Sequence, residues 1–197
     1  MARPAGTTRA KKPILKKEFD RLITATNRNL SLQHSSKIKF KRAFTLLYIT
    51  GCRVSEIAQL HSKDIEMMIK NNEFSLRNNT KTKSSRLITF DENRVQIEFL
   101  KKILPADNEY LFIKNNSIKP QTVSSLKYQM NKFIHKTLGE LYSTHSFRAG
   151  YITTAHQVGL SIRHIQEDIG HSNSATTARY ITVTHDEISR GKNRIGW

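Results

Sequence analysis

The sequence predicts a mainly α-helical fold with a small three-stranded antiparallel sheet. Apolar residues recur at helical spacing in the first third of the chain and again through most of its second half, which is typical of amphipathic helices. Between these regions lie short apolar runs separated by polar residues that favour turns, and this pattern indicates strands. The 197 residues are enough to bury one core, so we expect one domain, or one domain with a short appendage.

The first third of the chain predicts three helices. An apolar face indicates a helix near residues 16–28. The second helix carries apolar side chains at positions i, i+3, i+4, i+7 and i+8, namely Phe40, Ala43, Phe44, Leu47 and Tyr48. Ser35 or Ser36 is suited to cap its start. Gly51 interrupts this helix, and a short helix is expected near residues 54–61.

Three short strands are expected next, at residues 65–69, 74–76 and 87–90. The pair Asn71-Asn72 favours a turn between the first two strands. The polar residues 79–85 would form the tip between the second and third strands. Together these segments predict a small antiparallel sheet.

Helical spacing returns after the expected sheet. One helix carries apolar residues at 95–103, with acids in its first turn, and ends before Pro105. A longer helix covers residues 123–134, and the stretch 144–190 reads as several short helices. Breaks between the short helices are expected at Gly159 and Gly170.

An excess of basic residues indicates a polyanionic partner. The formal net charge is +17 and the pI is about 10.2, which favours nucleic acid because Lys and Arg that neutralise phosphates release counterions. An anionic membrane surface and a basic ribosomal-type protein are the alternatives. No apolar run approaches the roughly 20 residues that cross a bilayer, and the single cysteine, Cys52, excludes an internal disulfide. We expect a protein that is cytoplasmic or nucleoid-associated, or encoded by a virus or plasmid and active in the host cell.

Three segments hold side chains suited to chemistry on phosphate. They read TGCRVSEIAQL from Thr50, THSFRAG from Thr144 and IGHSNSATTARY from Ile169. Their candidate catalytic residues are Arg53, His145, Arg148, His171 and Tyr180. In order and spacing, the three segments resemble the three boxes of the tyrosine recombinase (phage integrase) family. The resemblance covers roughly residues 14–190 and implies the catalytic-domain fold that these recombinases share with type IB topoisomerases.

The candidate residues suit cleavage of DNA without a metal ion or ATP. Arg53 and Arg148 can clamp the phosphate, because a guanidinium group matches its oxygens bidentately. His145 and His171 can bind the phosphate and move protons near neutral pH. Tyr180 can act as the nucleophile. The resemblance implies the same roles and a 3′-phosphotyrosyl intermediate.

The resemblance also implies supporting residues and partners. A hairpin lysine would be the general acid, with Lys81 as the first choice and Lys83 as the second, and Glu56 would support its neighbours. The partner would be double-stranded DNA. Four copies of the protein would assemble as a homotetramer on two DNA sites, and the protein would be monomeric alone. No metal site and no cofactor are expected, since the remaining histidines lack the spacing of metal ligands.

The predicted layout has three parts: a flexible basic N-terminal arm at 1–13, the catalytic domain at 14–190 and a tail at 191–197. The arm would contact DNA through Arg3, Arg9, Lys11 and Lys12. Most members of the family carry a DNA-clamping domain ahead of the catalytic one, for which the arm is too short. The layout resembles that of the invertases that switch fimbrial genes. The alternative functions are relaxation of DNA, as in type IB topoisomerases, and regulation by a non-catalytic DNA-binding protein.

Overall fold

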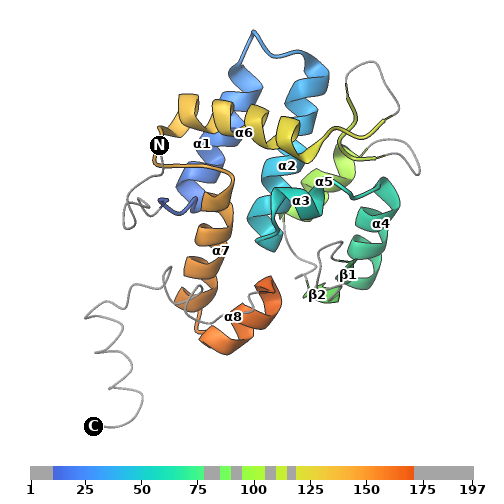
Figure 1. Cartoon of the computed structure of the whole chain (residues 1–197), viewed down its shortest axis with the longest axis vertical. Helices are drawn as coiled ribbons and strands as arrows, with labels where there is room; N and C mark the ends of the chain where they lie inside the picture. The colour runs from blue at the N-terminus through green and yellow to red at the C-terminus, as the bar shows by residue number, and fades with distance from the viewer. Residues whose placement is uncertain (1–10, 78–84, 90–94, 105–109, 115–118, 171–197) are drawn as a thin grey trace, which may run out of the picture.

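A computed structural model of the chain describes residues 11–77, 85–89, 95–104, 110–114 and 119–170. These residues form a body of helices with one two-stranded sheet at its edge (Figure 1). The elements are α1 (Lys16–Arg28), α2 (His34–Thr50), α3 (Val54–Ile57), α4 (Ser62–Asn71), β1 (Glu73–Arg77), β2 (Ser85–Thr89), α5 (Val95–Lys102), α6 (Val123–Leu138), α7 (His145–Gln157) and α8 (Ile162–Ile169). The mainly helical class with a small antiparallel sheet is confirmed. None of the described helices is long and apolar enough to cross a membrane.

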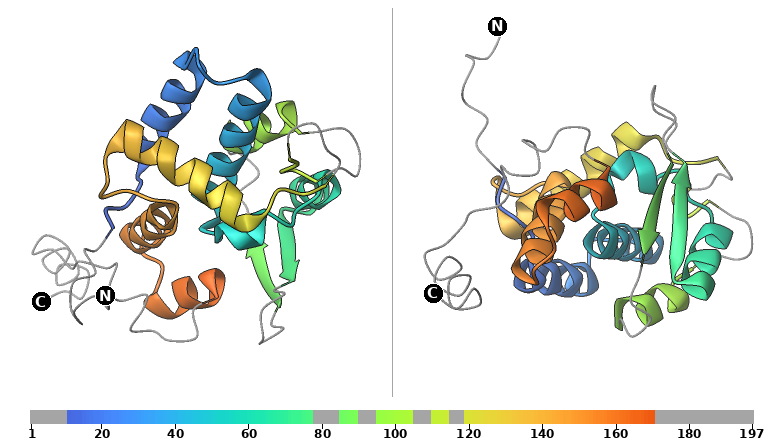
Figure 2. Two further views of the ribbon diagram at one scale, coloured as in Figure 1. Left: turned by 45° about the horizontal axis from the view of Figure 1, so that its top comes forward. Right: turned by 90° about the horizontal axis from the view of Figure 1, so that it is seen from below.

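The main core forms around α2, against which α1, α6 and α7 pack (Figures 1 and 2). The ring centroids of Phe44 and Phe147 lie 5.7 Å apart, and those of Phe40 and Phe133 lie 5.1 Å apart. These four rings join α2, α6 and α7. Each fully buried ring of this size contributes roughly 1.5–3 kcal/mol. The core therefore fixes α7, which carries the second motif, relative to α2, at whose end the first motif begins.

A smaller cluster attaches α8 to the far end of α7. Its buried members are Ile152, Ala155, Ile165 and Ile169, and Tyr151 packs against it. α8 also contacts β2. The third motif therefore begins on a helix whose apolar contacts are separate from the main core.

The strand expected at residues 65–69 is wrong, because this segment lies within α4. The Asp64 carboxylate accepts the backbone N–H of His61 at 2.8 Å and so closes the first turn of the helix. Ile65 and Met68, one helical turn apart, are both buried. These contacts favour a helix over a strand in a run too short for its periodicity to decide.

The described sheet consequently has two strands rather than three. Asn72 ends α4 in the left-handed conformation, with φ 56°, instead of forming a turn between strands. β1 and β2 pair antiparallel, with Phe74 opposite Ile88. Figure 2 shows this hairpin beside α4 at the edge of the helical body. Most of the polar tip expected at residues 79–85 lies outside the described residues.

Within the described residues the other helix predictions hold with two exceptions, and the helices expected after Gly170 lie outside these residues. The short helix expected near residues 54–61 is shorter, because α3 ends at Ile57. α1 spans the expected residues, and Gly51 ends α2 in the left-handed region with φ 61°. Left-handed glycines also follow α7 and α8, at Gly159 and Gly170. The predicted cap of α2 is wrong: Gln33 precedes the helix, so both candidate serines lie within its first turn.

The segment ahead of α1 packs along the start of α7. The backbone N–H of Lys12 donates to the carbonyl of Leu141 at 3.0 Å, and that of Ile14 donates to Ser146 at 2.9 Å. The Ile14 side chain is fully buried. Its carbonyl lies against Gly150, where an added Cβ would come within 2.0 Å of the oxygen. Only glycine therefore allows this approach.

Candidate active site

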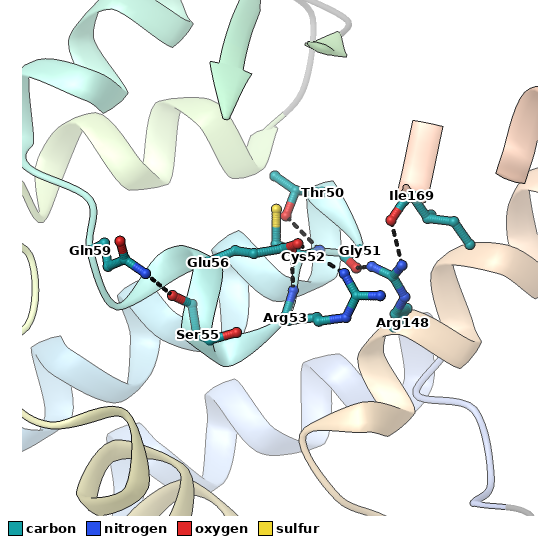
Figure 3. A network of polar contacts seen from close by, with 9 residues as sticks. All are labelled: Thr50, Gly51, Cys52, Arg53, Ser55, Glu56, Gln59, Arg148 and Ile169. Atoms are coloured by element: carbon teal, nitrogen blue, oxygen red, sulfur yellow. Dashed lines mark hydrogen bonds and ion pairs between the residues drawn. The ribbon is translucent and has the colours of Figure 1, made fainter. Parts of the chain in front are cut away.

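The turn between α2 and α3 presents Arg53. The Cys52 N–H donates to the hydroxyl of Thr50 at 3.1 Å, just before Arg53, which caps the start of α3. The buried Glu56 carboxylate accepts the Arg53 backbone N–H at 2.6 Å and its Nη1 at 3.0 Å (Figure 3). Backbone and guanidinium are thus held by one carboxylate, which suits the supporting role predicted for Glu56.

Arg148 reaches the same place from α7. Its side chain is buried, only 5% exposed. Nη1 donates to the carbonyl of Gly51 at 3.0 Å, although the two residues lie 97 positions apart in the sequence. Nη2 donates to the carbonyl of Ile169, the last residue of α8. Figure 3 shows the guanidinium between these two carbonyls and beside that of Arg53.

His145 is the first residue of α7, one helical turn before Arg148. The Asn131 side chain on α6 accepts the N–H of the preceding Thr144 at 2.8 Å, which fixes where α7 starts. Although part of the side chain is exposed, burial lowers the pKa of His145, and the cations of Lys127, Arg148 and Arg53 lower it further. These effects favour the neutral imidazole, which is able to accept a proton.

The side chains of Arg53, His145 and Arg148 line one pocket of about 100 Å³. Its described lining consists of Cys52, Arg53, Val54, Ser55, Val123, Lys127, Thr144, His145 and Arg148. Three of these residues are cations and none is a carboxylate. A small cationic pocket with two guanidinium groups is suited to bind a phosphate group.

A larger hollow of about 780 Å³ lies along α1 and includes Thr137 of α6. It contains none of the candidate catalytic residues. We therefore assign the site to the smaller pocket, where side chains from two motifs meet. Among the described residues, no cluster of three His, Cys, Asp or Glu side chains is placed to hold a metal ion.

The remaining predicted site residues divide into two groups. Lys11 and Lys12 lie by the loop between α6 and α7, where the Lys11 Nζ donates to the carbonyl of Glu140 at 2.9 Å. Those outside the described residues are Arg3, Arg9, Lys81, Lys83, His171 and Tyr180. The third motif is described only to Gly170, and its first residue, Ile169, already contacts Arg148.

Two residues near the pocket are not among those predicted from the sequence. Lys127 lines it, and Asn131 positions the start of α7. They lie four positions apart on α6 and follow Val123, another lining residue, by one and two helical turns. This regular spacing places the three residues on one face of α6, but the sequence does not show that this face meets the motifs.

Comparison with known proteins gives matches to one family. The family model described as "Phage integrase family" matches residues 12–187. Tyrosine recombinase XerC of Staphylococcus epidermidis is 30% identical over 168 residues, a match that covers 81% of this chain and 55% of that protein. The chain therefore spans about half the length of this relative.

Solved structures share the fold. The Tn1549 transposon integrase in complex with a circular intermediate DNA has a TM-score of 0.70 at 21% identity, covering 95% of this chain and 67% of that one. The XerH recombinase bound to its difH substrate has a TM-score of 0.68 at 18% identity, covering 93% and 54%. With a family model matching residues 12–187 and side chains from two of the three expected boxes meeting in one pocket, the chain belongs to the phage integrase family.

Proposed function

We propose that the protein is a site-specific DNA recombinase, which integrates, excises or inverts DNA by cutting and rejoining it through Tyr180. One observation carries the proposal. Arg53 and Arg148, from segments far apart in the sequence, meet in one cationic pocket with a neutral His145. This combination offers charge stabilisation and proton transfer at a phosphodiester without a metal ion.

The proposed reaction is a reversible exchange of esters. The Tyr180 oxygen attacks the phosphorus and loses its proton to a neighbouring base, for which neutral His145 is suited. A bond forms between Tyr180 and the 3′ phosphate while the bond to the 5′ oxygen breaks. The leaving oxygen takes a proton from Lys81, with Lys83 as the alternative donor. A 5′ hydroxyl then attacks the phosphotyrosine in the reverse sense, so no ATP is consumed.

The two arginines act on the charge that develops during this exchange. The scissile phosphate carries a negative charge on its non-bridging oxygens, and this charge grows as the fifth bond to phosphorus forms. Because Arg148 is buried and fixed by two carbonyls, it needs little reorganisation to meet that charge. His171 would add a further hydrogen bond to the same oxygens.

Double-stranded DNA is the proposed partner. The net charge of +17 favours phosphate binding, and the XerH recombinase with the same fold is bound to its DNA substrate. We further propose that four copies act on two DNA sites, because recombination exchanges four strands, and that the protein is monomeric alone. Arg3 and Arg9 of the N-terminal arm would add contacts to the DNA backbone.

Two assays run side by side test the function. Recombination between two sites on one plasmid, in excess EDTA, is expected to yield a rearranged plasmid. Relaxation of supercoils without rearrangement would favour the topoisomerase-like alternative. DNA binding with neither reaction would favour a non-catalytic regulator, and activity restored only by magnesium would refute the metal-free mechanism.

A further inference from the structure

Tyr151 connects three segments that meet around Arg148. It lies on α7, and its hydroxyl donates to the carboxylate of Asp168 on α8. Its ring packs directly on Gly51: a Cβ added there would come within 2.8 Å of the Tyr151 Cγ. One side chain therefore contacts the turn after α2 and binds α8.

The same two segments supply the acceptors that hold Arg148. Its Nη1 donates to the carbonyl of Gly51, against which the Tyr151 ring packs. Its Nη2 donates to the carbonyl of Ile169, next in sequence to Asp168. Tyr151 follows Arg148 by three positions, so both side chains project from one side of α7.

Apolar packing alone is a weak determinant of where α8 sits. Its buried side chains, Ile165 and Ile169, belong to a cluster separate from the main core, and α8 also contacts the edge strand β2. Hydrophobic contact is non-directional, so it permits small shifts and rotations of α8. The hydrogen bond from Tyr151 to Asp168 has a defined direction and length, and it therefore fixes the level of the Ile169 carbonyl relative to α7.

We propose that Tyr151 is a positioning residue for Arg148: it holds the Gly51 and Ile169 carbonyls so that the guanidinium faces the scissile phosphate. The role rests on the proposed cleavage of DNA. Without the Tyr151 hydroxyl, the Ile169 acceptor moves and Arg148 samples orientations that do not meet the developing charge. Misplacement by about 1 Å is enough to cost up to about a hundredfold in rate.

Two variants and a matched control test the proposal. Tyr151→Phe keeps the ring on Gly51 and removes the bond to Asp168, and Asp168→Asn weakens it from the other side. Glu167→Gln is the control, because it neutralises the neighbouring carboxylate on α8, which pairs with exposed Arg163 instead. We expect Tyr151→Phe to slow formation of the covalent DNA adduct about tenfold with unchanged DNA affinity, and Glu167→Gln to react as the unmodified protein does.

A second substrate separates positioning from a general loss of structure. DNA with a methyl group in place of one non-bridging oxygen carries no charge at the scissile phosphate, so its cleavage depends less on the Arg148 clamp. The defect of Tyr151→Phe should shrink to less than about twofold on this DNA if Tyr151 acts through Arg148. An equal defect on both substrates, or no defect on ordinary DNA, would overturn the proposal.

A readout without DNA keeps the proposal apart from the function on which it rests. The Arg148 guanidinium N–H groups, followed by NMR, should exchange with water faster in Tyr151→Phe than in the unmodified protein or in Glu167→Gln. Unmodified protein that forms no adduct would refute the proposed function. Unchanged Arg148 exchange in Tyr151→Phe would refute the positioning role, whatever the activity.

Discussion

At the scale of single residues, the pocket combines cations suited to bind phosphate with a histidine whose neutral form these cations favour. Burial and the charges of Lys127, Arg148 and Arg53 all lower the pKa of His145. The groups that would attract a phosphate therefore also keep the imidazole able to accept a proton. A bound phosphate would oppose these cations and make the neutral imidazole a stronger proton acceptor.

The midpoint of His145 titration should lie below the usual histidine pKa of about 6.5 and rise in Lys127→Met, which removes one of the cations. Lys17→Met, which removes an equal charge from α1, is the control. NMR of the imidazole protons measures each midpoint. A midpoint above 6.5, or an equal shift in both variants, would contradict the account.

The lowered pKa of His145 should also make folding stability depend on pH. Folded His145 binds a proton less readily than the unfolded chain does, so its contribution to the free energy of unfolding falls as the pH drops below about 6.5. The fall ends once the pH is below the lowered pKa of the folded state. Denaturation series on His145→Gln should show a shallower decline over this range, and an unchanged decline would assign it to other groups.

Glu56 should be needed for stability as well as for placing Arg53. Glu56→Ala removes the acceptor of the Arg53 backbone N–H at the start of α3 and leaves the guanidinium unheld. Loss of such a cap costs about 1 kcal/mol, and Glu56→Gln, which keeps an oxygen acceptor, should lose less. Urea denaturation measures both. Equal stability of the two variants would show that the oxygen atom does not cap the helix.

At the scale of elements, periodicity predicts the long helices because each buries a repeating face in the core. It fails at residues 65–69, where a short apolar run fits a strand or a helix equally well. The contacts that decide the case, Asp64 with the His61 backbone and the left-handed Asn72, are local, but the pair Asn71-Asn72 also suits a turn between strands. The hairpin itself is predicted correctly: β1 and β2 overlap the second and third expected strands and pair antiparallel.

Gly150→Ala tests how the N-terminal segment is fixed to α7. Helix propensity alone predicts stabilisation by about 1 kcal/mol, but the added methyl group would collide with the Ile14 carbonyl. We expect a net loss of about 1–3 kcal/mol, measured by thermal or chemical denaturation. Thr154→Ala, at an exposed position of the same helix, should change stability by only a few tenths of a kcal/mol. A stabilised Gly150→Ala would contradict the observed approach of Ile14.

At the scale of the whole molecule, the sequence predicts three reactive residues that meet in the described structure, but it predicts only part of what holds them. Arg53, His145 and Arg148 can be grouped because their motifs occur in a recognisable order. Lys127 and Tyr151 cannot, since their roles depend on how α6 and α8 pack against α7. Glu56 can be predicted because it lies within the first motif, three positions after Arg53, but local patterns contain no information on the packing that gives Lys127 and Tyr151 their places.

Net charge should govern DNA binding by the whole chain. With a net charge of +17, the logarithm of affinity should fall steeply with the logarithm of salt concentration. Replacing Arg3 and Arg9 by alanine should reduce this slope by about one unit for each phosphate that the arm no longer neutralises. Fluorescence anisotropy across a salt series measures the slope, and an unchanged slope would show that these two arginines do not bind DNA.

The covalent adduct is the most direct test of the central claim. Protein incubated in EDTA with a nicked DNA site, whose cut strand cannot be rejoined, should form a complex that survives SDS. Digestion and mass spectrometry should then identify a nucleotide attached through its 3′ phosphate to Tyr180. Tyr180→Phe should bind the same DNA and form no adduct. An adduct that persists in Tyr180→Phe, or that is attached to another residue, would contradict the account.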